Sequence, residues 1–226
     1  MNKIDFKKNK YTVIEKAVSG EISDFLYKYL LLKRRVAKTF LEKRFIPPYA
    51  EYFGIWTDYS VPNTYSHYAD IAMETLLVKL HPIMEKTVNL KLNPNYSYTR
   101  IYKKGDVLKR HKDRFSCEIS TTLFLGGDEW PIFLSPNKNV GIPDGKKITT
   151  KSNAKGVKVN LKQGDMLVYR GNELEHWREE FKGENCAQVF LHYNNTAAKG
   201  AKENLFDGRI HLGVPLDKMF LVKNNI

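Results

Sequence analysis

Residues 163–178, with the sequence QGDMLVYRGNELEHWR, contain two short strand patterns on either side of a turn. Met166–Tyr169 is an apolar run of strand length, and the Arg-Gly-Asn sequence that follows it is typical of a tight turn. A second strand pattern covers residues 174–177. Turn residues on both sides of such short apolar runs indicate antiparallel β-structure rather than helix.

The same pattern continues outward over about half of the chain. Short runs rich in β-forming residues alternate with turn residues between positions 92 and 196. Seven or eight short strands with frequent turns are typical of an antiparallel sandwich or jelly roll. The strands are expected at residues 96–102, 116–125, 132–134, 157–161, 166–169, 174–177 and 187–193.

The residues before position 92 follow helical patterns instead. Apolar residues recur at helical spacing over 19–35 and again over 68–81, and Ser19 or Ser23 is available as an N-cap of the first helix. Pro82 is expected to kink or restart the second helix, because proline lacks an amide hydrogen. We therefore expect a mainly β protein with N-terminal helices. The expected organisation is a single domain over 1–226, with 1–91 as helical support, 92–196 as the β core and 197–226 as a tail packed on the core.

Composition narrows the class of protein. Of the 226 residues, 42% are hydrophobic and 12% aromatic, which is ample for a packed core and atypical of disorder. Cys117 and Cys186 are too few for a disulfide framework or a cysteine-rich zinc site. Neither a secretory signal nor a membrane-spanning apolar run is visible. We expect a soluble, cytoplasmic protein without a membrane partner.

The net charge of +12 raises the question of an anionic partner. The excess comes from 28 lysines against 9 arginines, whereas forked recognition of bases and phosphates favours arginine. A lysine-rich loop at 138–162 is the one feature that would serve a nucleic acid. The composition favours a solvated lysine surface over a nucleic-acid partner.

Three side chains could hold a metal ion. His111 and Asp113 alternate in an extended segment, so their side chains share one face. His176 follows 65 residues later, just after a hairpin turn. Two histidines and one carboxylate on one side of a metal are the arrangement of non-haem Fe(II) oxygen chemistry. Taken alone, a His-x-Asp pair among cationic neighbours is more typical of a surface ion pair, so the order of the surrounding elements decides.

That order resembles the prolyl 4-hydroxylase-like branch of the Fe(II)- and 2-oxoglutarate-dependent oxygenases. The resemblance covers about residues 92–196 and is carried by residues 102–105, His111 with Asp113, 163–169, His176 and the last strand at 187–193. It implies a double-stranded β-helix that binds Fe(II) through His111, Asp113 and His176. It also implies 2-oxoglutarate and O2 as co-substrates, with ascorbate as a candidate accessory factor.

One departure from the family pattern concerns the co-substrate. The family usually has an Arg or Lys about ten residues beyond the distal histidine, and Cys186 occupies that position here. A buried dicarboxylate without a cation would be costly. Arg178 is the first choice for that cation, because it can share the face of His176 and a guanidinium grips a carboxylate with two hydrogen bonds. The alternative role for Arg178 is a salt bridge to a neighbouring glutamate. Arg100 and Lys182 are the next candidates for the cation that pairs with 2-oxoglutarate.

Four further residues are candidates near the site. Tyr102 lies where the family often has a tyrosine that touches the co-substrate, with a core aromatic as the alternative. Arg114 is expected to orient Asp113 or to meet substrate, with a plain surface role as the alternative. Trp130 is assigned to the substrate mouth, with a core or hairpin role as the alternative. His192 is interpreted as a residue of the sheet.

The resemblance implies a dioxygenase that hydroxylates an unactivated C–H bond, with a prolyl or other residue of a peptide or protein as substrate. Oxygenases acting on nucleic acids or on free amino acids are alternatives within the same superfamily. A non-catalytic cupin-like binding module is an alternative of a different class, and a sugar or nucleotide isomerase on the same barrel type is a further one. The thiol at Cys186 favours a binding module, whereas the complete ligand set favours an enzyme.

Overall fold

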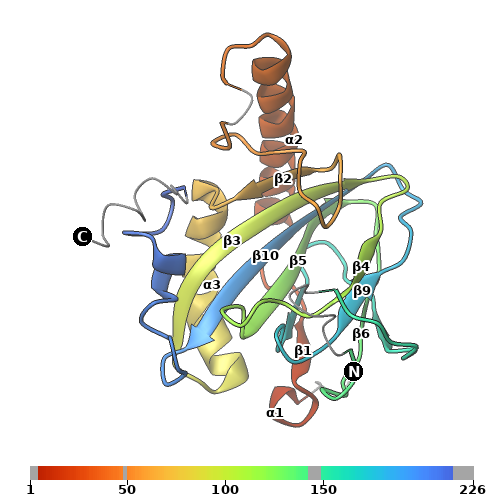
Figure 1. Cartoon of the computed structure of the whole chain (residues 1–226), viewed down its shortest axis with the longest axis vertical. Coiled ribbons are helices and arrows are strands. Elements are labelled where there is room, and N and C mark those ends of the chain that lie inside the picture. The colour runs from red at the N-terminus through yellow and green to blue at the C-terminus, as the bar shows by residue number, and fades with distance from the viewer. Residues whose placement is uncertain (1–4, 48–49, 142–148, 216–226) are drawn as a thin grey trace.

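Two antiparallel sheets form the core of the computed structural model, which describes residues 5–47, 50–141 and 149–215 (Figure 1). The larger sheet has the strand order β1-β8-β5-β10-β3-β2, and the smaller has the order β4-β9-β6-β7. The strands are β1 Tyr11–Ile14, β2 Tyr65–Tyr68, β3 Leu92–Lys103, β4 Leu108–His111, β5 Ile119–Gly127, β6 Ile132–Leu134, β7 Val157–Val159, β8 Met166–Tyr169, β9 His176–Arg178 and β10 Asn185–Asn195.

From β3 onward the chain passes back and forth between the two sheets. Strands β3, β5, β8 and β10 belong to the larger sheet, whereas β4, β6, β7 and β9 belong to the smaller one. This crossing between two facing sheets is the jelly-roll arrangement. The chain therefore has the double-stranded β-helix core that its sequence predicts.

The larger sheet is buried on both faces, and β8 shows how the sequence achieves this. Met166 and Val168 pack into one apolar cluster with the helices, while Leu167 and Tyr169 pack into a second cluster with residues of the smaller sheet. Side chains alternate between the two faces of a strand, so a continuous apolar run fills both clusters. This explains why the β8 sequence is apolar throughout and not alternating.

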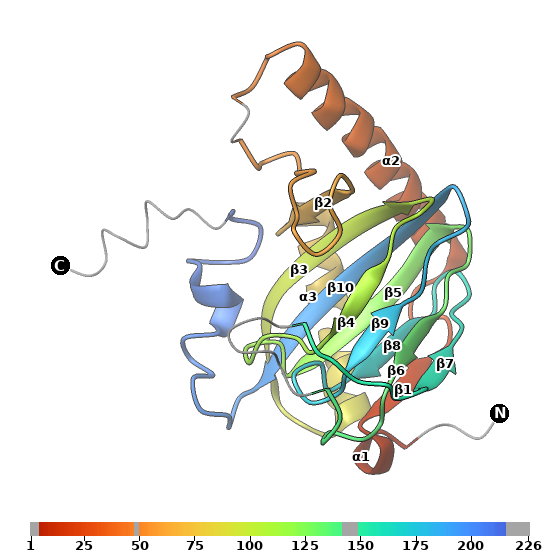
Figure 2. The same cartoon turned by 45° about the vertical axis from the view of Figure 1, so that its right-hand side comes forward.

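Two long helices cover the outer face of the larger sheet. They are α2 Gly20–Glu42 and α3 Ile71–Val88, and Figure 2 shows them on the side away from the smaller sheet. The Ser19 hydroxyl accepts a hydrogen bond from the Ile22 amide at 3.3 Å and caps α2 as predicted. The described residues also form two short elements, the helix α1 Phe6–Asn9 and the 3-10 helix η1 Leu205–Gly208.

Of the two outcomes expected at Pro82, a kink or a restart of the helix, the structure excludes the restart. The helix α3 runs from Ile71 to Val88 with Pro82 inside it, so it does not restart at the proline. The carbonyl that loses a partner belongs to Val78, four residues earlier. Because the Val78 residue is 54% exposed, water can serve that carbonyl.

The N-terminal third contributes strands as well as helices. Strand β1 pairs with β8, and β2 pairs with β3, so both extend the larger sheet at its two edges. Each has four residues, which is too short for a periodic pattern to identify it. The segment expected as helical support over 1–91 thus holds the strands β1 and β2 in addition to its helices.

The C-terminal segment contacts the helical layer through a buried ion pair. Arg209 Nη2 lies 2.7 Å from Oε1 of Glu74 in α3, and both side chains are 2% exposed. Residues 216–226 of the expected tail and part of the lysine-rich loop at 138–162 lie outside the described residues. No helix among those that the structure describes is long and apolar enough to cross a membrane.

Candidate metal centre

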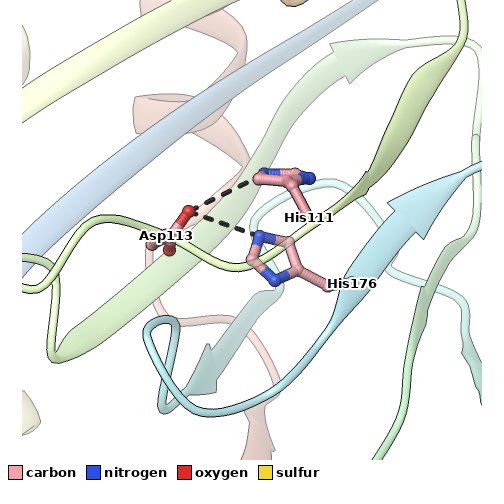
Figure 3. Close-up of side chains that lie close together, drawn as sticks. All are labelled: His111, Asp113 and His176. Carbon is pink, nitrogen blue, oxygen red and sulfur yellow. Dashed lines mark ion pairs between the residues drawn. The ribbon is translucent and has the colours of Figure 1, made fainter. Parts of the chain in front are cut away.

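The three predicted metal ligands lie close together where β4 ends and β9 begins (Figure 3). His111 ends β4 and His176 begins β9, and the two residues are directly opposite each other in the antiparallel pairing of these strands. Asp113 follows two residues after His111. Its Oδ1 atom lies 3.4 Å from His176 Nε2 and 3.7 Å from His111 Nε2. One ligand atom from each residue falls within 4.8 Å of the others.

Backbone carbonyls fix which nitrogen of each histidine faces the centre. Nδ1 of His111 lies 2.8 Å from the carbonyl oxygen of Lys109, and Nδ1 of His176 lies 2.9 Å from that of Leu174. A carbonyl can only accept a hydrogen bond, so Nδ1 carries the proton in both rings. The Nε2 lone pairs therefore point toward Asp113, as in metal-ligating histidines with an outer-shell acceptor.

The charge state of the cluster also suits a divalent cation. Burial, with the neighbouring His176, lowers the pKa of His111 to about 4. Burial would raise the pKa of Asp113, but His176 together with His192 and His111 outweighs burial and holds that pKa below the usual range. At neutral pH the cluster thus offers an unprotonated imidazole and a carboxylate, the forms that bind metal.

Two hydrogen bonds fix the position of Asp113. Its carboxylate Oδ2 accepts a hydrogen bond from the Ser120 hydroxyl at 2.6 Å, and its backbone amide donates to the backbone carbonyl of Gly171 at 2.9 Å. A Cβ atom at Gly171 would lie 2.1 Å from Asp113 Oδ2 and 2.3 Å from Ser120 Oγ. The turn after β8 therefore requires glycine because the ligand carboxylate occupies the space of a side chain.

A cavity of about 240 Å³ opens onto this centre. Its walls carry His111, Asp113 and His176 together with Tyr59 and several aromatic residues of the larger sheet. The aromatic and polar side chains relevant to ligand binding are Tyr59, Tyr96, Tyr98, Tyr169, Phe190, His192, Arg100 and Arg114. The cavity is thus a mixed aromatic and polar pocket with the candidate metal centre in its wall.

Arg178 is a fully buried cation without an acidic partner among the described residues. One of its Nη atoms donates to the carbonyl of Trp130 and the other to the Thr122 hydroxyl at 3.2 Å, while Nε has no partner. Burial lowers the pKa of Arg178. The neighbouring Glu175 instead pairs with Arg110 at 3.1 Å, so it does not neutralise Arg178. Leaving a charge buried and uncompensated is strongly unfavourable.

The two reserve cations are placed differently. Arg100 lines the cavity, but its Nη2 pairs with Asp58 at 2.8 Å and its Nη1 donates to the Tyr102 hydroxyl at 3.3 Å. Lys182 is mostly exposed and pairs with Glu180 at 2.6 Å, so the fold does not bring it to the centre. Arg178 does not line the cavity itself but lies near enough to the cavity residue Tyr169 for each to affect the other's pKa.

Two other predicted residues lie beside the site. Trp130 is buried in the apolar cluster, with its ring 4.8 Å from that of Tyr102 and next to Arg178, and it does not line the cavity, so it takes the core role and not the expected place at the substrate mouth. Arg114 lies over the Tyr96 ring at 4.6 Å and pairs with Asp207 at 2.6 Å. Arg114 therefore connects the loop after Asp113 to the C-terminal segment.

Sequence reasoning missed Ser120 and Gly171 and interpreted His192 only as a sheet residue. Ser120 in β5 and His192 in β10 are register partners, and both lie close to Asp113 through the Ser120 hydroxyl. No local motif indicates this arrangement, because it depends on pairing between strands about seventy residues apart. The sequence places Gly171 in a turn, but only the three-dimensional structure shows that it packs against the Asp113 carboxylate.

No protein-family model and no curated protein sequence matches the chain. Solved structures share its fold. A prolyl-4-hydroxylase from Pseudomonas putida is 15% identical, with a TM-score of 0.54, over 84% of this chain and 95% of that one. HygX from Streptomyces hygroscopicus, with nickel, 2-oxoglutarate and hygromycin B bound, is 15% identical, with a TM-score of 0.59, over 85% of each chain. The epimerase SnoN, in complex with Fe3+, alpha ketoglutarate and nogalamycin RO, is 12% identical, with a TM-score of 0.60, over 85% of this chain and 81% of that one.

Proposed function

We propose that this chain is an Fe(II)- and 2-oxoglutarate-dependent oxygenase. The observation that carries the proposal is the combination of a two-histidine, one-carboxylate cluster with a buried arginine that has no acidic partner. His111, Asp113 and His176 would hold Fe(II), because the donor set leaves one side of the metal open. Bound Fe(II) with 2-oxoglutarate and O2 supplies the oxidising power, and the protein supplies binding and orientation.

Arg178 would pair with the far carboxylate of 2-oxoglutarate. In related enzymes a cation on the last core strand has this role, and here that position is Cys186, which is buried and faces Tyr102 in the β10–β3 register. The Cys186 thiol lies close enough to Arg178 to affect its pKa. The guanidinium of Arg178 thus brings a positive charge to the region in which Cys186 provides none.

The pairing state of the two buried arginines supports this choice over Arg100. Asp58 already neutralises Arg100, so a dicarboxylate would gain little from it. An incoming carboxylate at Arg178 would instead compensate a charge that the protein leaves unpaired, which favours binding. A buried, unpaired cation beside an idle metal-binding motif would only destabilise a non-catalytic module, so the same observation favours the enzyme over the cupin-like alternative.

The substrate we propose is a peptide or protein residue, with proline as the first candidate. The cavity is small, about 240 Å³, and tyrosines line its walls, which suits one inserted ring or side chain better than a large polycyclic molecule. The similar structures include a prolyl hydroxylase as well as proteins solved with hygromycin B or nogalamycin RO. Small molecules and free amino acids are therefore the competing substrates.

The test of the substrate class is a mass-spectrometric screen with Fe(II), 2-oxoglutarate and O2. Proline-containing peptides, free L-proline and a set of glycosides are incubated in parallel with the protein and with His176→Ala. The proposal predicts a gain of one oxygen atom on a peptide, accompanied by one succinate, in the unsubstituted protein alone. Oxidation confined to free proline or to glycosides would overturn the peptide assignment while leaving the oxygenase in place.

A further inference from the structure

A hydrogen-bonded chain runs from the candidate metal ligand Asp113 to the cavity residue His192. The Ser120 hydroxyl lies 2.6 Å from Asp113 Oδ2 and 3.1 Å from His192 Nδ1. Ser120 and His192 are opposite each other in the β5–β10 register, and both are buried. The chain is therefore fixed by the pairing of two central strands of the larger sheet.

The direction of each hydrogen bond follows from counting protons. A carboxylate only accepts, so at 2.6 Å the serine proton must point to Asp113, since two facing lone pairs at that distance would repel. The carbonyl of Cys117, 3.2 Å from the same hydroxyl, is also an acceptor and supplies no proton. Ser120 then has only a lone pair left for His192, so Nδ1 of His192 must carry the hydrogen.

This leaves Nε2 of His192 as an unprotonated acceptor. His192 forms part of the cavity wall, with its ring centroid 4.5 Å from that of Tyr96. No described residue makes a hydrogen bond to Nε2, and Nε2 is not among the fully enclosed polar atoms. Burial lowers the pKa of His192 to about 4, consistent with a neutral ring.

We propose that His192 is a specificity-determining residue that accepts a hydrogen bond from an amide N–H or hydroxyl group of the substrate, and that Ser120 is the positioning residue that fixes its tautomer through Asp113. This inference rests on the proposed function, because it assigns a role within the same cavity. It selects for substrates that carry such a donor near the reacting carbon. A residue within a peptide offers one in the backbone N–H of its neighbour.

The first test is the tautomer of His192, which is independent of any co-substrate. The full chain is labelled with ¹⁵N-histidine and loaded with Zn(II), a diamagnetic probe, and His192→Asn assigns the resonances. We expect His192 to show a protonated Nδ1 and an unprotonated Nε2, and we expect Ser120→Ala to abolish that preference. A protonated Nε2 in the unsubstituted protein would overturn the proposal.

The second test asks whether Nε2 accepts a hydrogen bond from a ligand. N-methylacetamide, which has one N–H donor, and N,N-dimethylacetamide, which has none, are titrated into the same Zn(II)-loaded sample. We expect only N-methylacetamide to shift the His192 Nε2 resonance in a saturable way. Equal shifts with the two amides, or none with either, would contradict the assignment.

A matched pair of variants separates the two parts of the chain. His192→Asn keeps an amide donor near the position of Nδ1 but removes the Nε2 acceptor, so Fe(II) affinity should stay within about twofold. Ser120→Ala removes the partner of the ligand carboxylate, and the expected loss of Fe(II) affinity is about 10- to 100-fold. Unchanged Fe(II) affinity in Ser120→Ala would overturn its positioning role. Failure of the unsubstituted protein to bind 2-oxoglutarate would count against the proposed function alone, because none of these readouts requires the co-substrate.

Discussion

His111 and His176 are paired across two antiparallel strands, with their ring centroids 4.1 Å apart. The register of β4 against β9 alone creates this proximity, since the two residues are 65 positions apart in the chain. Both rings are oriented by carbonyls of their own strands or the preceding turn. Strand pairing and these carbonyl contacts therefore hold the two imidazoles side by side.

Gly171→Ala should damage this centre although residue 171 is not a ligand. The added methyl group would overlap Asp113 Oδ2 and Ser120 Oγ, at 2.1 and 2.3 Å. We expect Fe(II) affinity, measured by anaerobic titration, to fall at least about tenfold. Gly20→Ala is the matched control, because a Cβ there meets nothing within 4 Å. Unchanged Fe(II) affinity in Gly171→Ala would show that the carboxylate position is not critical.

Arg178→Met should move ligand affinity and stability in opposite directions. Removal of the buried, unpaired cation should leave the ligand-free protein equally stable or more stable, whereas the affinity for 2-oxoglutarate should weaken by about 2–5 kcal/mol. Calorimetric titration and thermal unfolding measure the two effects. Lys182→Met, at an exposed side chain, should change neither. Retained affinity in Arg178→Met would exclude this residue and shift attention to Arg100.

We proposed that Arg178 supplies the positive charge that Cys186 cannot. Moving the cation to position 186 on the last core strand tests this proposal. The double variant Arg178→Met/Cys186→Lys places a lysine where related enzymes carry one, beside Tyr102 in the register. We expect it to regain about tenfold of the 2-oxoglutarate affinity lost in Arg178→Met, because it restores a charge-assisted contact. Circular dichroism confirms that the double variant is folded. A folded double variant that regains no 2-oxoglutarate affinity would contradict the proposal that Arg178 replaces a cation at position 186.

Asp70 should make stability depend on pH at the acid end. Its carboxylate caps α3 through the Met73 amide and pairs with Lys33, and the Tyr29 hydroxyl donates to it at 2.7 Å. Burial would raise the pKa of Asp70, but His67, Lys33 and Tyr29 outweigh it and hold that pKa below the usual range. The stabilisation is therefore complete above the unfolded-state pKa of about 3.9 and is lost as the pH falls below it.

Urea unfolding of Asp70→Asn between pH 7 and pH 3 measures this contribution. At pH 7 the variant should be about 1–3 kcal/mol less stable, because it loses the buried ion pair while Asn still caps the helix. The variant should also lose less stability on acidification than the unsubstituted protein. Asp24→Asn, which removes an exposed pair with Lys28, should stay within about 0.5 kcal/mol. Parallel pH curves for Asp70→Asn and the unsubstituted protein would contradict the assignment.

The sequence predicts the parts of the fold and site that have short-range signals. Alternation within one extended segment placed His111 and Asp113 together, and residues 176 and 178 likewise share a strand face. The edge strands β1 and β2 were not predicted, because each has only four residues and shows too little alternation of apolar and polar residues. The helix α3 continues through Pro82, which spacing alone does not reveal.

The missing parts of the site all depend on contacts between distant strands. Ser120 and His192 acquire their roles from the β5–β10 register, and Gly171 acquires its own from contact with Asp113. Asp58, in a loop, neutralises Arg100 of β3. Arg178 has no such acidic partner among the described residues. Such pairings give no local pattern, so only the three-dimensional structure distinguishes the two arginines.

The central claim is tested most directly by anaerobic addition of Fe(II) and then 2-oxoglutarate to the unsubstituted protein, followed by visible absorption spectroscopy. We expect a metal-to-ligand charge-transfer band that requires both components, is absent in His176→Ala, and in Arg178→Met appears only at much higher 2-oxoglutarate concentration. Binding of Fe(II) without any such band at saturating 2-oxoglutarate would contradict the assignment of this cluster as a 2-oxoglutarate-dependent centre.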